Sequence, residues 1–82
     1  MDSYLIPSLR LIVSSQIGAT SLLQRKLKIS YQHAGRIMDQ LERLKVVDVY
    51  NGEFSRKVLI KNMLKSEMLI LRIYIWRMFK EN

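Results

Sequence analysis

The segment SLLQRKLKISYQHAGRIMDQLERLKVV contains two helix-start signals separated by a short basic bend. Ser21 and Gln24 form the S-x-x-Q pattern of a capping box, and Ser30 is a second N-cap residue. These signals predict a short helix over about residues 22–28, followed almost at once by a longer helix over residues 31–44. A compact turn sets the second helix across the first, an arrangement typical of a helix-turn-helix.

The flanking segments extend this order at both ends. Apolar residues at helical spacing predict a first helix over about residues 7–15, with Pro7 in its first turn and Gly18 as its stop. After the longer helix, VVDVY and EFSRKVLI are β-prone runs on either side of Asn51-Gly52, a pair that suits a two-residue hairpin turn. Three helices followed by a hairpin give the order of a winged helix-turn-helix.

The predicted fold class is therefore mainly α with a small β-hairpin. Residues 1–62 are expected to form a winged helix-turn-helix domain, and residues 63–82 an extra C-terminal segment. The chain has 82 residues, of which 49% are hydrophobic. A fold of this size buries only about 60% of the surface of its unfolded chain. We therefore expect one domain with a small core.

The composition favours a polyanionic partner and excludes several classes of site. Fourteen Lys and Arg against seven Asp and Glu give a formal net charge of +7. The absence of cysteine excludes disulfides, iron–sulfur clusters and thiolate zinc sites. The N-terminus lacks the pattern of a signal peptide, and the apolar runs are too short for a span of about 20 residues. A cytoplasmic location is expected.

Apolar and polar residues separate onto two faces of the helix predicted over residues 31–44. The apolar face, expected in the core, holds Tyr31, Ala34, Ile37, Met38, Leu41 and Leu44. The opposite face holds Gln32, His33, Arg36, Asp39, Gln40 and Arg43. This helix can therefore present polar groups to a DNA major groove.

One family shares this pattern in register. Its members carry S-x-x-Q-R-(K/R)-(L/F)-(K/R)-I-G-Y-N-R-A-A-R-(I/M)-(I/M)-(E/D), followed by a hairpin ending in R-E-V-L. The matching residues are Ser21, Gln24, Arg25, Lys26, Leu27, Lys28, Ile29, Tyr31, Ala34, Arg36, Ile37, Met38 and Asp39, and SRKVL stands at the hairpin ending. The segment from about Asp2 to Leu59 thus resembles the C-terminal γ domain of the bacterial chromosome translocase FtsK.

The resemblance implies a winged helix that reads short, oriented, G-rich sequences in double-stranded DNA and contacts a recombinase. It assigns base reading to the positions of Gln32, Arg36 and Asp39. The chemistry of the side chains agrees, because arginine donates two hydrogen bonds to guanine and a carboxylate accepts from the cytosine amino group. A good bidentate pair contributes roughly 1–3 kcal/mol of discrimination.

Other cations on the predicted domain are candidates for phosphate contacts. They are Arg25, Lys26, Lys28, His33, Arg43, Arg56 and Lys57. The alternative is that these side chains simply face water, and that Asp39 pairs with Arg36 or Arg43 at helical spacing.

The chain departs from the family pattern at several positions. Gln32-His33 replaces Asn-Arg, which predicts a different sequence preference. Gly35 replaces an alanine within a helix, at a cost of about 1 kcal/mol, and Lys45 stands where a glycine often ends the helix.

No enzyme, metal or cofactor is expected from this sequence. No G-x-x-x-x-G-K-[ST] loop is present, so the chain is not expected to be a motor. His33 is the only histidine, and the acids are scattered without a catalytic pattern. The prediction is a stand-alone reader or a remnant of a translocase.

Residues 63–82 form an apolar segment that needs a partner surface. Alternating spacings of four and three predict a helix with a packing seam at Leu64, Met68, Leu71, Ile75 and Met78. This seam could cover the chain's own first helix or form a homodimer. Membrane binding is disfavoured, because Arg72 and Arg77 are not segregated from the apolar face. The run ILRIYIW also has strand character.

The sequence thus predicts a bacterial, nucleoid-associated protein that binds double-stranded DNA with some sequence preference. The alternative is a protein-docking module, acting through recombinase contact or self-association, without base-specific binding.

Overall fold

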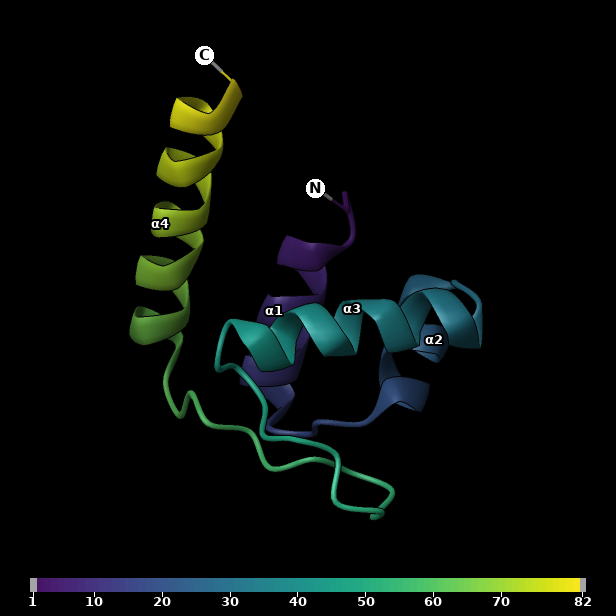
Figure 1. Ribbon diagram of the computed structural model, residues 1–82. Helices are drawn as coiled ribbons and strands as arrows, with labels where there is room; N and C mark the ends of the chain where they lie inside the picture. Colours follow the sequence, from purple (N-terminus) through teal and green to yellow (C-terminus); the bar gives the residue numbers. More distant parts are fainter. Residues whose placement is uncertain (1, 82) are drawn as a thin grey trace.

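The computed structural model describes residues 2–81, which form four helices and almost no strand (Figure 1). These helices are α1 (Leu5–Ser15), α2 (Thr20–Leu27), α3 (Tyr31–Arg43) and α4 (Met63–Glu81). The predicted mainly helical class is confirmed, and the C-terminal segment is a helix.

Helix α1 begins two residues before Pro7, so the proline lies in the first turn, where its missing N–H has no intrahelical partner to lose. The helix ends at Ser15 and not at the predicted stop, Gly18. Gln16 takes the left-handed conformation with φ 58°, and its backbone N–H donates to the carbonyl of Ile12 at 2.8 Å. Its side-chain amide also donates to the carbonyl of Ile60 at 2.9 Å, which holds the strained residue in place.

Gly18 instead allows the backbone of Arg56 to approach closely. Its carbonyl accepts from the N–H of Arg56 at 2.9 Å in an antiparallel bridge. A Cβ atom at this position would lie 2.3 Å from the carbonyl oxygen of Arg56, so only glycine fits.

The predicted capping box of α2 is wrong. The helix begins at Thr20, its N-cap is Ala19 without a side-chain hydrogen bond, and Ser21 lies inside the first turn. Leu22 and Leu23 of this short helix are buried in the core, and such packing supplies most of the stability of a helix this short.

Helix α3 begins as predicted, since the Oγ atom of Ser30 accepts from the backbone N–H of His33 at 3.1 Å. The expectation that Tyr31 packs in the core is wrong, because 64% of this residue is exposed. Beyond the helix, Lys45 takes φ 64°, the conformation for which a glycine would be favoured.

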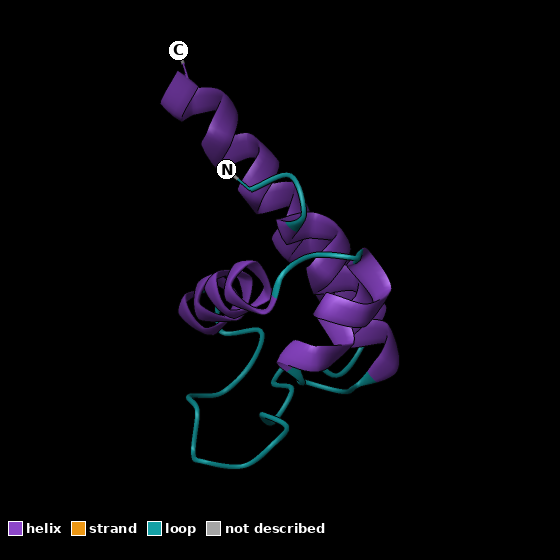
Figure 2. Ribbon diagram, turned by 90° about the vertical axis from the view of Figure 1, so that its right-hand side faces the viewer, coloured by secondary structure: helices purple, strands orange, loops and turns teal. Residues whose placement is uncertain are grey.

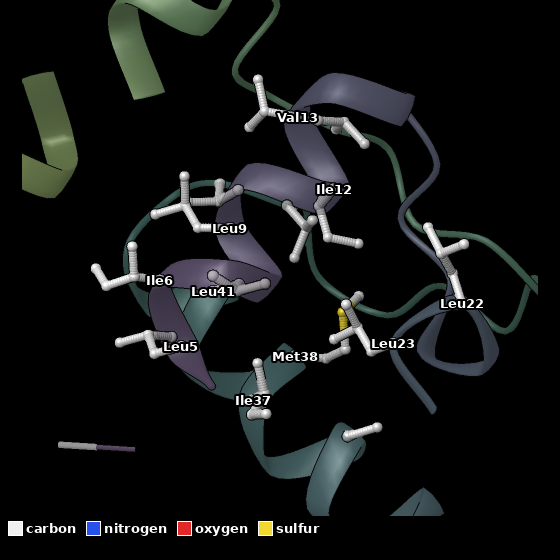
Figure 3. Close-up of a cluster of buried hydrophobic side chains, with 14 of the residues drawn as sticks. Leu5, Ile6, Leu9, Ile12, Val13, Leu22, Leu23, Ile37, Met38 and Leu41 are labelled. Atoms are coloured by element: carbon white, nitrogen blue, oxygen red, sulfur yellow. The ribbon is translucent and has the colours of Figure 1, made fainter. Parts of the chain in front are cut away.

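The core lies where α1, α2 and α3 meet (Figure 3). Each helix turns a stripe of fully or nearly buried apolar side chains toward the other two. Figure 3 labels Leu5, Ile6, Leu9, Ile12, Val13, Leu22, Leu23, Ile37, Met38 and Leu41. Val46, Val47 and Val58 extend the core to the segment after α3.

The predicted β-hairpin is not formed as a pair of strands within residues 2–81, and Figure 2 draws this segment as a loop. Two short arms still face each other: the N–H of Asp48 donates to Lys57 at 2.9 Å, and the N–H of Leu59 donates to Val46 at 2.8 Å. Between the arms, residues 49–55 are exposed, so little packing supports a longer ladder. We call residues 46–59 the wing loop.

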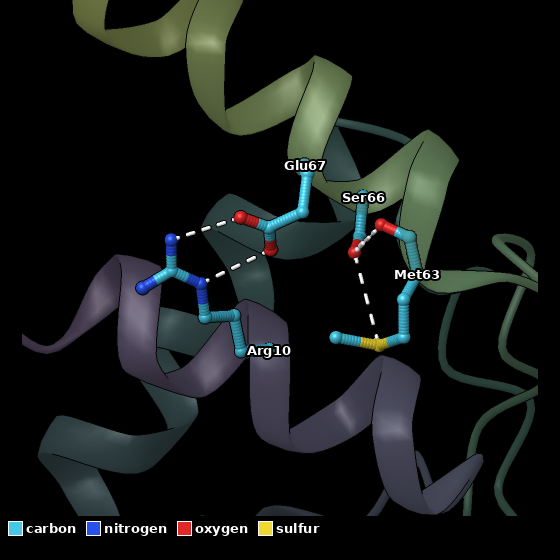
Figure 4. Close-up of polar contacts among 4 residues, drawn as sticks. All are labelled: Arg10, Met63, Ser66 and Glu67. Carbon is cyan, nitrogen blue, oxygen red and sulfur yellow. Dashed lines mark hydrogen bonds and ion pairs between the residues drawn. The ribbon is translucent and has the colours of Figure 1, made fainter.

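Helix α4 packs against α1 through Ser66, Ile70 and Ile73, which are buried. Figure 4 shows Glu67 of α4 accepting two hydrogen bonds from the guanidinium of Arg10 on α1, at 3.0 and 3.1 Å. This hydrogen bonding lowers the pKa of the Glu67 carboxyl.

Within the described chain, no helix combines the length and apolar character needed to cross a bilayer.

Candidate nucleic-acid interface

The polar face of α3 lies open to solvent. Gln32, Arg36, Asp39 and Arg43 are all exposed and follow one another at spacings of four, three and four residues. Residues at these spacings share one side of a helix. The residues buried in the core, Ala34, Ile37, Met38 and Leu41, occupy the opposite side. We call the four exposed residues the α3 stripe.

A basic cluster adjoins α3 at the end of α2. Arg25 and Lys26 lie in the last turn of α2, and Lys28 follows at its C-cap with φ 57°. All three side chains are exposed. Helices α2 and α3 pack directly on one another, and two residues separate Lys28 from the start of α3.

His33 lies beside the stripe but faces the N-terminal segment. Its Nε2 atom is 2.6 Å from the Oδ2 atom of Asp2, and its ring meets Tyr4 edge-on at 5.3 Å between centroids. Partial burial raises the pKa of Asp2, but hydrogen bonds from the Tyr4 N–H and from His33 outweigh it and lower that pKa overall. His33, a predicted phosphate contact, thus has a polar partner within the domain.

Arg56, another predicted phosphate contact, is largely buried and paired with acids of α3. Only 12% of its side chain is exposed, and its guanidinium lies 2.9 Å from a carboxylate oxygen of Glu42 and 3.7 Å from one of Asp39. It also lies 5.8 Å from the centre of the Tyr50 ring. The charge of Arg56 is thus shared with two acids of α3, whereas its neighbour Lys57 is exposed.

Three exposed aromatic side chains form a feature that the sequence analysis missed. Tyr31 is the first residue of α3, and Tyr50 and Phe54 lie in the wing loop. Tyr50 is 64% exposed and Phe54 is 82% exposed. Together they line a small cavity of about 140 Å³. The signal was present in the sequence, because aromatic residues that flank Asn51-Gly52 have no core to enter.

The predicted α4 seam faces away from the domain. Between 45% and 72% of each seam residue is exposed, and the set comprises Leu64, Met68, Leu71, Ile75 and Met78. Helix α4 thus covers α1 with the opposite face.

No group of three or more acidic or histidine side chains suited to a metal ion occurs among residues 2–81.

Comparison with known proteins identifies similar sequences. Residues 1–61 match the family model described as the Ftsk gamma domain. The DNA translocase FtsK of Corynebacterium efficiens is 49% identical over 57 residues, covering 70% of this chain and 6% of the relative. The DNA translocase FtsK of Chlorobaculum tepidum is 42% identical over 69 residues, covering 84% of this chain and 9% of that relative. The DNA translocase FtsK of Mycobacterium leprae is 46% identical over 61 residues, covering 74% of this chain and 7% of that relative. The chain spans less than a tenth of the length of these relatives.

Proposed function

The chain belongs to the Ftsk gamma domain family, and from this premise we propose that it binds double-stranded DNA with a sequence preference, with α3 in the major groove. The observation that carries the proposal is the α3 stripe, whose four polar side chains are exposed on the side opposite the core. An α-helix with such a face fits the major groove of B-DNA.

Base reading falls to three residues of the stripe. Arg36 donates two hydrogen bonds to guanine, and Gln32 pairs with the exposed edge of adenine. Asp39 accepts from the amino group of cytosine. Its carboxylate is also 3.7 Å from Arg56, so reading by Asp39 is coupled to the wing loop. Arg36 accounts for one guanine of a preferred site, and the resemblance to the family implies that such sites are G-rich.

Phosphate contacts fall to exposed cations on both sides of the stripe. These cations are Arg25, Lys26, Lys28, Arg43 and Lys57. His33 and Arg56 hold other parts of the domain in position, because both already have internal partners. The exposed aromatic side chains of the wing loop add apolar contact with the sugar edge of the duplex.

We propose the role of a DNA reader for these 82 residues. The relatives are named DNA translocases, and this chain corresponds to less than a tenth of their length. Its expected setting is the nucleoid in the bacterial cytoplasm.

Selection of bound duplexes from a random pool tests the proposal directly. A recovered motif containing guanine supports base reading by α3. The same selection with Arg36→Ala should lose its enrichment at one G·C position. If wild-type protein enriches no sequence yet still binds the pool, the base-reading part is wrong.

A second candidate function is protein docking, favoured by the exposed seam of α4. The seam would pair two copies of the chain or contact a recombinase. Sedimentation equilibrium of wild type and of Leu71→Glu tests the homodimer, since a buried charge in the seam should leave only monomer. Lys61→Glu changes an exposed residue outside the seam and is the control.

A further inference from the structure

A large groove is lined by residues from the start of α1, the end of α3 and α4. Figure 1 shows where these three helices lie. The volume of the groove is about 710 Å³. The floor is apolar and is built from three helices: Leu5 of α1, Leu44 at the end of α3, and Leu69, Ile73 and Trp76 of α4. Such volumes and linings are typical of ligand sites.

The groove remains open because α4 is longer than the surface that it covers. Its first half is docked on α1 through Ser66 and Ile70. Farther along, 59% of Trp76 is exposed although its ring lines the groove. The apolar floor is therefore only partly covered by the chain itself.

Both rims of the groove are positively charged. Arg43 stands on the α3 side, and Arg72 and Lys80 stand on the α4 side. The ammonium group of Lys80 lies 5.4 Å from the centre of the Trp76 ring. No acidic side chain of the described residues lines the groove.

From this arrangement we infer that the groove binds an amphipathic helix of a partner protein that carries acidic residues along both edges of its apolar stripe. A helix docks into such grooves through apolar side chains at positions i, i+3, i+4 and i+7. Acids at the edges of the stripe would meet Arg43 on one rim and Arg72 on the other. Charge complementarity of this kind orients a partner and speeds its association.

The inference is independent of DNA binding by the α3 stripe, with one link between them. Arg43 belongs to the stripe and also to the rim of the groove. An acidic helix in the groove would therefore compete with a phosphate for this residue. In addition, α4 lies outside the segment that matches the family model, so the groove arises where the extension meets the domain.

Trp76 provides a reporter within the site, because it is the only tryptophan of the chain. The probe is a synthetic helical peptide with leucine at i, i+3, i+4 and i+7 and glutamate on both flanks, titrated into the full chain without DNA. A saturable blue shift of Trp76 emission is expected. Arg72→Glu should weaken binding about tenfold, since it places like charges together. Lys61→Glu makes the same charge change at an exposed residue outside the groove and should leave the affinity unchanged.

Four results would overturn the inference. One is the absence of a blue shift, and another is an equal shift with a matched peptide carrying lysine in place of glutamate. A third is a shift that appears on raising the protein concentration alone, which would assign the groove to a second copy. The last concerns vesicles of equimolar phosphatidylcholine and phosphatidylglycerol. If these vesicles shift Trp76 emission, while the glutamate peptide causes no shift and does not displace them, the groove would be assigned to a membrane surface.

Discussion

The guanidinium of Arg56 donates to a carboxylate oxygen of Glu42 at 2.9 Å, across 14 residues of sequence. The backbone N–H of the same arginine donates to Gly18. One residue thus fastens the wing loop both to α3 and to the segment before α2.

Replacing Arg56 with alanine should loosen the wing loop. The change leaves the half-buried carboxylate of Glu42 without its partner, which is expected to lower the free energy of unfolding by about 1–3 kcal/mol. Urea denaturation measures this loss. Lys57→Ala, at the exposed neighbouring residue, should change stability by less than about 0.5 kcal/mol. Equal effects of the two substitutions would show that the ion pair adds nothing.

Arg36→Ala and Lys26→Ala should affect DNA binding in different ways. Removal of Arg36 should cost about 1–3 kcal/mol at a preferred site and relax the preference at one G·C position. Removal of Lys26 should weaken all duplexes alike and lower the salt dependence of binding by about one unit of slope. Fluorescence anisotropy with a preferred and a random duplex at two salt concentrations separates these effects. Uniform loss with Arg36→Ala would contradict its assignment.

Gly35→Ala should stabilise the protein. Apart from its chain neighbours and the nearby backbone of α3, no atom lies within 4 Å of a Cβ placed on Gly35, so the added methyl meets no packed side chain. The gain in helix propensity is about 1 kcal/mol, which corresponds to roughly 4–8 °C in Tm for a domain of this size. Calorimetry should give the opposite sign for Gly18→Ala, because that methyl group would collide with the backbone of Arg56.

Ser8→Ala should also stabilise the protein. Ser8 is fully buried in α1, and its hydroxyl has no hydrogen-bond partner among the described residues. Removing an unsatisfied buried hydroxyl is worth about 1–3 kcal/mol. Ser66→Ala is the matched control on α4, because this buried hydroxyl donates to the carbonyl of Met63 at 2.8 Å. Similar gains in denaturation midpoint for both variants would show that hydrogen bonding is not the cause.

Asp2 should make the stability of the domain depend on acidic pH. The folded state lowers the pKa of its carboxyl, so the unfolded chain takes up the proton first on acidification. The stabilising contribution is complete above the unfolded pKa of about 3.9 and is lost as the pH falls through the lower folded pKa. Asp2→Asn keeps an acceptor for the Tyr4 N–H but removes the charge. The stability difference between wild type and this variant should therefore shrink between pH 7 and pH 3, and a constant difference would contradict the assignment.

The parts of the fold that follow from local chemistry could be predicted from the sequence. Helix α3 combines an N-cap at Ser30 with a clear apolar period, and both signals indicate the same helix. Its exposed stripe follows from that period alone. The left-handed residue at position 45 could be anticipated too, because Lys45 stands where the family pattern often has a glycine that ends the helix.

The parts that depend on distant partners could not be predicted. Gln16 replaces a glycine stop because its side chain reaches Ile60, 44 residues away. The alternation of side chains along a strand does not reveal that Arg56 turns inward to Glu42 rather than outward to solvent. Tyr31 is exposed because the buried stripe of α3 begins only at Ala34, a boundary set by the position of α1 and α2.

Helix α4 has an apolar residue set on each of two opposite sides, and only one of them is docked on α1. Excision of residues 63–82 would remove the outward leucines and methionines but uncover the α1 flank beneath Ile70 and Ile73. A shortened chain would lose one exposed apolar surface and gain another. Substitutions confined to the outer side of α4 are therefore the better way to make this domain monodisperse.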